Sequence, residues 1–235
     1  MSSSIRSLAI MPAYNEEKYI GEIVLLTKQY VDEVIIGDDG SRDDTSKIAK
    51  LAGATVLRCE INEGYGVTIQ KLLLEAKRRN PDVLILLDAD AQHNPHEIPN
   101  LVKPIICGES DVVVGSRRLC WSSIPLYRRA GLRVLTHLTC LLSGRKLFDT
   151  ECGFRAFSGK AIAMLELREN GMAISAETIY EATKKNLRVV EVPVSVVYTK
   201  DGSTLNPIRH GLGNLIRILT MISRKKVYLS KEEKK

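Results

Sequence analysis

The sequence has few aromatic residues and no long apolar run. Phe, Trp and Tyr make up 5% of its 235 residues, and it contains one tryptophan. Its basic segments lack the interleaved aromatic side chains that stack on unpaired bases, which argues against a nucleic-acid-binding protein. A membrane-spanning helix needs roughly 20 uninterrupted apolar residues, and no window provides them. The nearest candidate, 205–222, is interrupted by Arg209, His210, Asn214 and Arg217.

The cysteines also exclude some classes of protein. There are five of them, an odd number, and none is arranged as CxxC. This usage is typical of reduced intracellular thiols rather than of a disulfide framework or a zinc site. The opening residues, MSSSIRSLAI, contain no apolar stretch long enough for a secretory signal. We therefore expect a cytoplasmic protein.

Charge is divided unevenly along the chain. Residues 1–118 carry 14 basic and 18 acidic side chains, net −4, whereas residues 119–235 carry 20 and 10, net +10, within a total of +6. With 44% apolar and 26% charged residues, the chain is not disordered, and its length suits one α/β core. We expect one domain over 1–235, in which the 1–118 and 119–226 halves face different partners and 227–235 forms a charged tail.

Strand-like and helix-like segments alternate through the first half. Strands are expected at 7–11, 33–36, 55–57, 83–87 and 111–115, and helices at 17–30, from 43, at 64–80 and at 94–107. Apolar strands separated by helices predict a mostly parallel sheet with helices on both faces. Beyond residue 118, helices are expected at 125–142, 159–168, 176–186 and 208–224. A strand is expected at 187–198, where Pro193 favours a sheet edge.

Polar side chains gather where these strands end, and this is where parallel sheets bind ligands. Asp88 and Asp90 directly follow the wholly apolar run 83–87. Two carboxylates at this spacing can hold Mg²⁺ or Mn²⁺ together with phosphate oxygens, and Gln92 adds an amide oxygen. The alternative is a turn with solvated acids, because Asp is a common turn residue. This pattern alone leaves both interpretations open.

Six motifs, taken in order, make the sequence resemble the family 2 glycosyltransferases. They are Pro12-Ala13-Tyr14-Asn15-Glu16, Asp38-Asp39-Gly40-Ser41 with Thr45, Asn62-x-Gly64-x-Gly66, Asp88-x-Asp90-x-Gln92, Gly115-Ser116-Arg117 and Gly153-Phe154-Arg155. Within that family the sequence is similar to the dolichol-phosphate mannose synthase and polyprenyl-phosphate glucosyltransferase branch. The resemblance implies a GT-A-type, Rossmann-like fold. It also implies an inverting transfer of a hexose from a nucleotide-diphosphate donor of the GDP-mannose or UDP-glucose type.

The resemblance further implies roles for single residues. The nucleotide sugar would contact Pro12, Ala13, Tyr14, Glu16, Ile36, Asp38, Asp88, Ala89 and Asp90. Asp90 and Gln92 would hold the divalent cation, Mg²⁺ or Mn²⁺, and Asp90 and Arg117 would be the catalytic residues. The acceptor phosphate would meet Arg117, Arg129, Arg155 and Lys200. Arg155 is equally consistent with a structural ion pair, and Lys200 is the substitute for a lysine that this chain replaces with Thr204.

The basic second half favours an anionic acceptor, and we expect polyprenyl or dolichyl phosphate. Such a phosphate already carries a nucleophilic oxygen and needs cations to hold it rather than a general base. A hydroxyl acceptor would need a carboxylate base, for which Asp149 or Glu151 would serve. A soluble enzyme that elongates a glycan or glycolipid is therefore one alternative. A nucleotide-sugar-binding protein without turnover is another.

A lipid acceptor would bring the protein to a membrane. The basic amphipathic segments 126–142 and 208–226 are consistent with a helix lying on an anionic leaflet, and equally with helices packed on the core. For a lipid acceptor we expect a peripheral position on the cytosolic face or a membrane-protein partner.

Overall fold

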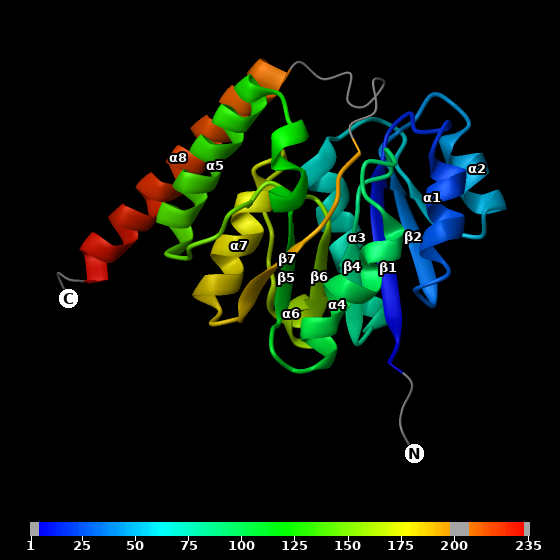
Figure 1. The fold of residues 1–235 in the computed structure, drawn as a ribbon, viewed down its shortest axis with the longest axis horizontal. Helices are drawn as coiled ribbons and strands as arrows, with labels where there is room; N and C mark the ends of the chain where they lie inside the picture. The colour runs from blue at the N-terminus through cyan, green and yellow to red at the C-terminus, as the bar shows by residue number, and fades with distance from the viewer. Residues whose placement is uncertain (1–4, 198–206, 233–235) are drawn as a thin grey trace.

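The computed structural model describes residues 5–197 and 207–232, and at its centre is a seven-stranded sheet (Figure 1). Its strands are β1 (Ser7–Ala13), β2 (Glu33–Asp38), β3 (Thr55–Arg58), β4 (Val83–Leu86), β5 (Val112–Ser116), β6 (Arg155–Ser158) and β7 (Val189–Pro193). Their order is β3-β2-β1-β4-β6-β5-β7. Only the pairs made by β6 are antiparallel among these strands, so the predicted mostly parallel sheet is confirmed.

The strand pattern of the sequence does not predict β6. This strand inserts between β4 and β5 and pairs antiparallel with both, with Phe157 opposite Leu84 on one side and Val112 on the other. The predicted strand 187–198 is confirmed in part, as β7 at the edge of the sheet. It ends at Pro193. Because β7 is an edge strand with no neighbour on its outer side, a proline, which has no N–H, is tolerated there.

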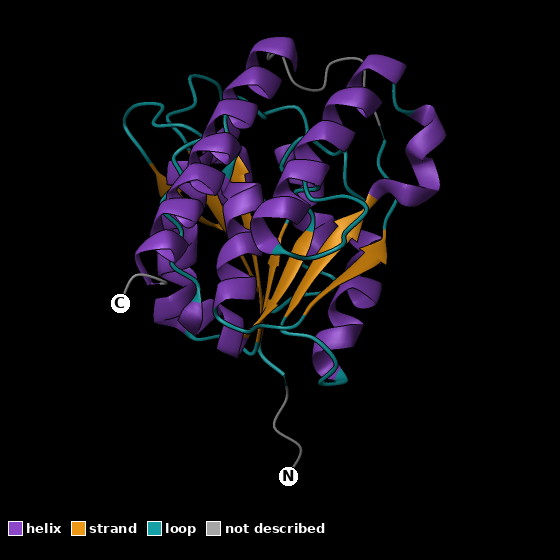
Figure 2. Cartoon of the chain, turned by 90° about the vertical axis from the view of Figure 1, so that its left-hand side faces the viewer, coloured by secondary structure: helices purple, strands orange, loops and turns teal. Residues whose placement is uncertain are grey.

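Helices cover both faces of the sheet (Figure 2). One face packs against α1 (Ile20–Thr27), α2 (Thr45–Leu51) and α4 (Ile98–Ile106), and the other against α3 (Tyr65–Arg79), α6 (Gly159–Met164) and α7 (Ile174–Lys184). Alternate side chains of one strand enter different cores: Ala9 and Met11 face α1, whereas Leu8 and Ile10 face α3. Burial on both faces explains why these strands are continuous apolar runs.

Some helix boundaries differ from those expected. The segment 94–107 begins as a 3-10 helix, Pro95–Glu97, in which the Asn94 side chain accepts from His96 N at 3.1 Å; α4 follows directly. The helix expected over 159–168 ends at Met164, because the backbone turns extended at Leu165. The last helix, α8 (Pro207–Glu232), extends past residue 224, so the expected charged tail is helical in its backbone as far as 232.

The helices α5 (Leu126–Ser143) and α8 form an outer pair beside the sheet layers (Figure 1). Leu135 of α5 and Ile218 of α8 share an apolar cluster with Ala176 of α7. The inner faces of both amphipathic segments therefore pack on the protein. Within the described residues, no helix is long and apolar enough to cross a membrane.

Candidate active site

The loops after β1 and β2 are tied together at the carboxyl edge of the sheet. Asn15 N donates to Ser41 Oγ at 2.9 Å, and Glu16 N donates to Thr45 Oγ1 at 2.8 Å. In return, Arg42 N donates to Asn15 Oδ1 at 2.9 Å, with Asn15 in the left-handed region at φ 56°. These bonds explain the four-residue spacing between Ser41 and Thr45. They fix the segment that presents Tyr14 and Glu16.

Three carboxylates converge at this edge. Burial above all, and then the charges of Asp90, Asp43 and Asp88, raise the pKa of Glu16 to about 7. Burial also raises the pKa values of Asp88 and Asp90, and the charge of Asp88 adds to the effect on Asp90. Since burial makes all three acids harder to ionise, and the neighbouring acids add to this for Glu16 and Asp90, the cluster favours a bound cation.

Two residues that sequence reasoning missed hold Asp88 in place. Tyr65 Oη donates to Asp88 Oδ1 at 3.0 Å. A Cβ on Gly153 would stand 2.3 Å from Asp88 Oδ2, so this carboxylate packs directly on the glycine. Both residues lie within two of the six motifs, Asn62-x-Gly64-x-Gly66 and Gly153-Phe154-Arg155. The motifs therefore mark these two positions, but they do not predict that both contact Asp88.

A tight turn fixes the second acid. Ala91 adopts φ 59°, an uncommon conformation for a residue with a Cβ. It brings Gln92 N to 3.1 Å from Asp90 Oδ1. Behind the turn, His93 is buried and stacks on Phe154 with ring centroids 5.3 Å apart. Burial lowers the pKa of His93 to about 4, so its ring is neutral and makes no ion pair with Asp88, 3.8 Å away.

Arg117 is held in a bidentate ion pair. Its Nε and Nη2 lie 2.6 Å from the two oxygens of Asp149, and its backbone N donates to the same carboxylate at 3.1 Å. Burial alone would raise the pKa of Asp149, but the hydrogen bonds and charge of Arg117 outweigh it and lower that pKa. Glu191 of β7 accepts from the backbone N of both Phe148 and Asp149 at 2.8 Å. The guanidinium is thus positioned before any substrate arrives.

Other predicted site residues are engaged within the protein. Arg155 is buried and donates to the carbonyls of Cys152, Ser175 and Thr150 at 2.9, 2.9 and 2.7 Å. These bonds hold the guanidinium within the protein and favour the structural role for Arg155 that the sequence left open beside a phosphate contact. Its partners are carbonyls rather than a carboxylate.

Asp38 and Ile36 are fully buried as well. The Asp38 carboxylate accepts from Ser41 N at 2.8 Å and from the hydroxyl of Ser46, and Arg58 lies 3.8 Å away. These bonds shape the β2 loop. Of the expected phosphate ligands, Arg129 lies half-buried on α5, and Lys200 lies outside the described residues.

The chemistry of the donor set fits a divalent cation at Asp90. The acids crowd one another, and Asp90 and Gln92 supply hard oxygen atoms of the kind that Mg²⁺ and Mn²⁺ prefer. A second group within the described residues, Asp39, Cys59 and Glu63, also has ligand atoms close together. Its members, however, already have partners within the protein. Asp39 accepts from two backbone N–H groups, and the Lys71 ammonium contacts Glu63 and Cys59.

Comparison with known sequences then assigns the family. The sequence profile described as Glycosyl transferase family 2 matches residues 8–164, which include β2 to β6 and nearly all of β1. The chain belongs to glycosyl transferase family 2. The resemblance seen in the six motifs is confirmed, and all six lie inside the matched region of this family 2 glycosyltransferase.

Two relatives with named activities are similar over most of their length. A UDP-N-acetylglucosamine–dolichyl-phosphate N-acetylglucosaminyltransferase of Methanococcus voltae is 34% identical over 214 residues, covering 81% of this chain and 85% of that protein. A dolichyl-phosphate hexose transferase of Haloferax volcanii is 29% identical over 205 residues, covering 86% and 87%.

Solved structures show the fold. Glucosyl-3-phosphoglycerate synthase from Mycobacterium tuberculosis, in complex with Mn²⁺, UDP-glucose and phosphoglyceric acid, superposes with a TM-score of 0.72 at 20% identity. The match covers 94% of this chain and 81% of that one. This glycosyltransferase therefore has the expected GT-A-type fold.

Proposed function

We propose that the enzyme transfers a hexose, with inversion at C1, from a nucleoside diphosphate sugar to the phosphate of a polyprenyl or dolichyl lipid. The observation that carries this proposal is the juxtaposition of the acids Glu16, Asp88 and Asp90 with the positioned cation Arg117, whose charge acts on Asp88. The names of the two dolichyl-phosphate relatives support the choice of acceptor.

The donor would lie along the ends of β1 and β4. Tyr14, 41% exposed, is open to the base, and Glu16 and Asp88 offer acceptors for ribose and sugar hydroxyls. Pro12 and Ala13 at the end of β1 pair with Gly37 and Asp38 of β2, and with Ile36 and Ala89 they would complete the donor site. Asp90 and Gln92 would hold Mg²⁺ or Mn²⁺, which supplies charge neutralisation for the leaving diphosphate.

The acceptor phosphate would lie against Arg117, with Arg129 as a second cation. One of its anionic oxygens bonds to C1 of the sugar as the bond from C1 to the diphosphate oxygen breaks, so no proton has to be removed. The nucleoside diphosphate leaves. Because Asp149 is paired with Arg117 and its pKa is lowered, it is unsuited to be a base. A hydroxyl acceptor would use Glu151, whose pKa burial raises.

The outer helix pair suits a peripheral contact with the membrane that holds such a lipid. On α5, Tyr127, Val134 and Leu141 are exposed and seven residues apart, so they lie on one face of the helix. On α8, Leu212, Ile216 and Leu219 are also exposed. The same helix carries the basic residues Arg128, Arg129 and Arg133. We propose that it rests on an anionic cytosolic leaflet.

Radiolabelled transfer tests the proposal. Nucleotide sugars would be incubated with Mn²⁺ and polyprenyl phosphate, and we expect a lipid-linked sugar phosphate that mild acid cleaves. Asp90→Asn should lower turnover by about 1,000-fold, since the metal then lacks its carboxylate. The matched control is Asp44→Asn, whose side chain is 62% exposed and should be silent. Transfer only to a hydroxyl acceptor, with any donor, would refute the lipid-phosphate assignment.

A further inference from the structure

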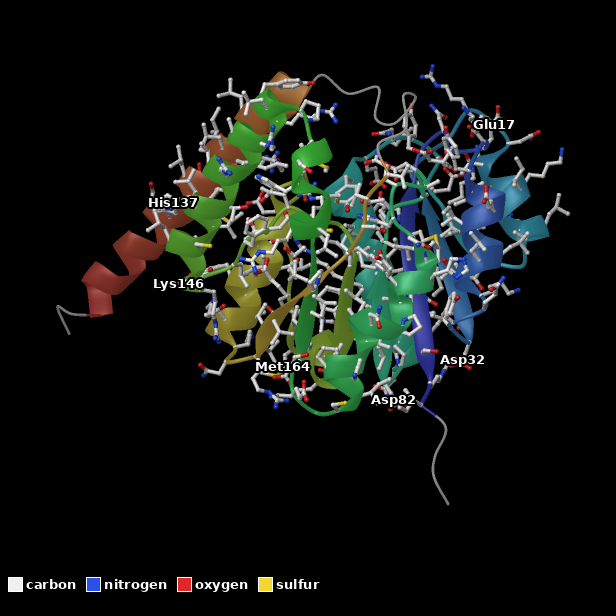
Figure 3. The ribbon with its side chains drawn as sticks, in the orientation of Figure 1. Glu17, Asp32, Asp82, His137, Lys146 and Met164 are labelled. Atoms are coloured by element: carbon white, nitrogen blue, oxygen red, sulfur yellow. The ribbon has the colours of Figure 1, made fainter. Side chains whose placement is uncertain are left out.

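An open cavity of about 390 Å³ lies beside α5, apart from the carboxylate cluster. It is bounded by α5, by the segment 146–148 that follows this helix, and by Trp121 of the short helix Arg117–Ser123. Figure 3 shows His137 and Lys146 of its lining on the α5 side of the molecule, far from Glu17 at the β1 loop. Its size is in the range of ligand pockets.

Aromatic rings form the apolar part of the lining. Trp121 meets Phe148 edge-on, with ring centroids 5.1 Å apart. Both rings are backed by cations: Arg133 lies 5.5 Å from the centroid of Trp121, and Arg118 lies 4.8 Å from that of Phe148. The indole Nε1 of Trp121 is buried and has no hydrogen-bond partner among the described residues.

The polar part of the lining is basic. Arg133, His137 and Lys146 contribute to it, and no described lining residue is an Asp or Glu. The two permanent cations, Arg133 and Lys146, around an apolar floor are suited to a ligand that combines an anionic group with an apolar body. A phosphate joined to a hydrocarbon chain has this chemistry.

The cavity is also connected to the proposed catalytic cation. Phe148 directly precedes Asp149, which forms the ion pair with Arg117. Glu191 accepts hydrogen bonds from the backbone N–H groups of Phe148 and Asp149. Trp121 lies four residues after Arg117, with a kink at Cys120 between them. A ligand that moves Phe148 therefore acts on the Arg117–Asp149 pair through the adjacent residue, and one that moves Trp121 acts through four residues of backbone.

We propose that this cavity binds the phosphate of an anionic lipid at a site separate from the transfer site. The phosphate interacts with Arg133, His137 and Lys146, while the first carbons of the chain lie on Trp121 and Phe148. Occupancy of the cavity steadies the segment that holds Arg117. The binding claim does not depend on the transfer reaction.

Trp121 is the only tryptophan of the chain, so its fluorescence reports on this cavity directly. The full-length protein would be titrated with farnesyl phosphate, with farnesol and with inorganic phosphate. We expect a saturable change with farnesyl phosphate and a response at least tenfold weaker with each of the other two. Lys146→Gln should raise the Kd for farnesyl phosphate about five- to tenfold, because one charge-assisted contact is lost. The matched control Lys50→Gln, on α2, should leave it unchanged.

Equal affinity for inorganic phosphate would overturn the lipid part of the proposal and leave a simple anion site. No saturable change, or the same Kd in Lys146→Gln as in the wild type, would overturn the site itself. Sugar transfer to a lipid phosphate without any Trp121 response refutes the cavity alone. A Trp121 response without such transfer refutes the proposed function alone.

Discussion

Replacing Gly153 by alanine tests whether the position of Asp88 matters for the reaction. The added Cβ would stand 2.3 Å from Asp88 Oδ2 and 2.9 Å from its Cγ, whereas ordinary contacts begin at 3.4 Å. The carboxylate must therefore move by about 1 Å. Because the obstacle is the end of a side chain and not backbone, the fold can adjust by turning Asp88 away from Tyr65.

The expected effect on activity is much larger than the effect on stability. A displacement of about 1 Å in a group that positions substrate costs on the order of 100-fold in rate, or about 2.7 kcal/mol of barrier. The lost hydrogen bond from Tyr65 costs about 1 kcal/mol of unfolding free energy. For a chain of this size that lowers Tm by about 2–4 °C.

The assay compares kcat/KM for sugar transfer with Tm from thermal unfolding. Gly131→Ala on α5 is the matched control, because its Cβ would meet no atom within 4 Å. We expect it to keep full activity and to stabilise the helix by about 0.5–1 kcal/mol. If Gly153→Ala keeps kcat/KM within threefold of the wild type, the geometry of Asp88 is not what the reaction depends on.

Three further perturbations address other parts of the site. Arg155→Met should lower the free energy of unfolding by about 3 kcal/mol in urea titrations, because three buried carbonyls lose a charged donor. A loss below 1 kcal/mol would contradict the structural role of Arg155. Glu16 has a raised pKa in the folded state, so its ionisation opposes folding at pH values above its ordinary pKa. Without metal, Glu16→Gln should therefore stabilise the protein by about 1 kcal/mol at pH 8 and not at pH 4. Equal changes in Tm at both pH values would refute this. Burial raises the pKa of the Cys152 thiol to about 12, whereas Cys107 is exposed. Iodoacetamide at pH 8 should therefore label Cys107 and not Cys152 in the native protein, as measured by mass spectrometry. Labelling of both cysteines would contradict this prediction.

The parallel part of the sheet was predictable because its strands carry a strong local signal. Val83 to Leu86 is buried on both faces, and nothing but a central strand tolerates such a run. β6 carries no such signal. It has four residues, and the first of them is Arg155, a charge that pattern reasoning assigns to the surface. Only the three carbonyls gathered around this guanidinium explain its burial, and they come from positions 150, 152 and 175.

The site was predictable in its acids but not in what holds them. Asp88 and Asp90 follow a buried strand, so their placement at the sheet edge came from topology alone. The supports of the site, such as Tyr65, Gly153 and Glu191, act over long sequence separations. The local partners of Asp38 were not predictable either: its carboxylate accepts from Ser41 and Ser46 within the β2 loop.

The central antiparallel strand has a consequence for how the protein is made. β4 lies in the middle of the finished sheet, yet its partner on one side, β6, is synthesised about 70 residues later. Until residue 158 has left the ribosome, β4 is an open edge with unpaired N–H and C=O groups, the kind of edge that recruits other chains. The acidic and basic halves of the sequence are therefore not separable pieces. The first half has to wait for the second before its own sheet can close.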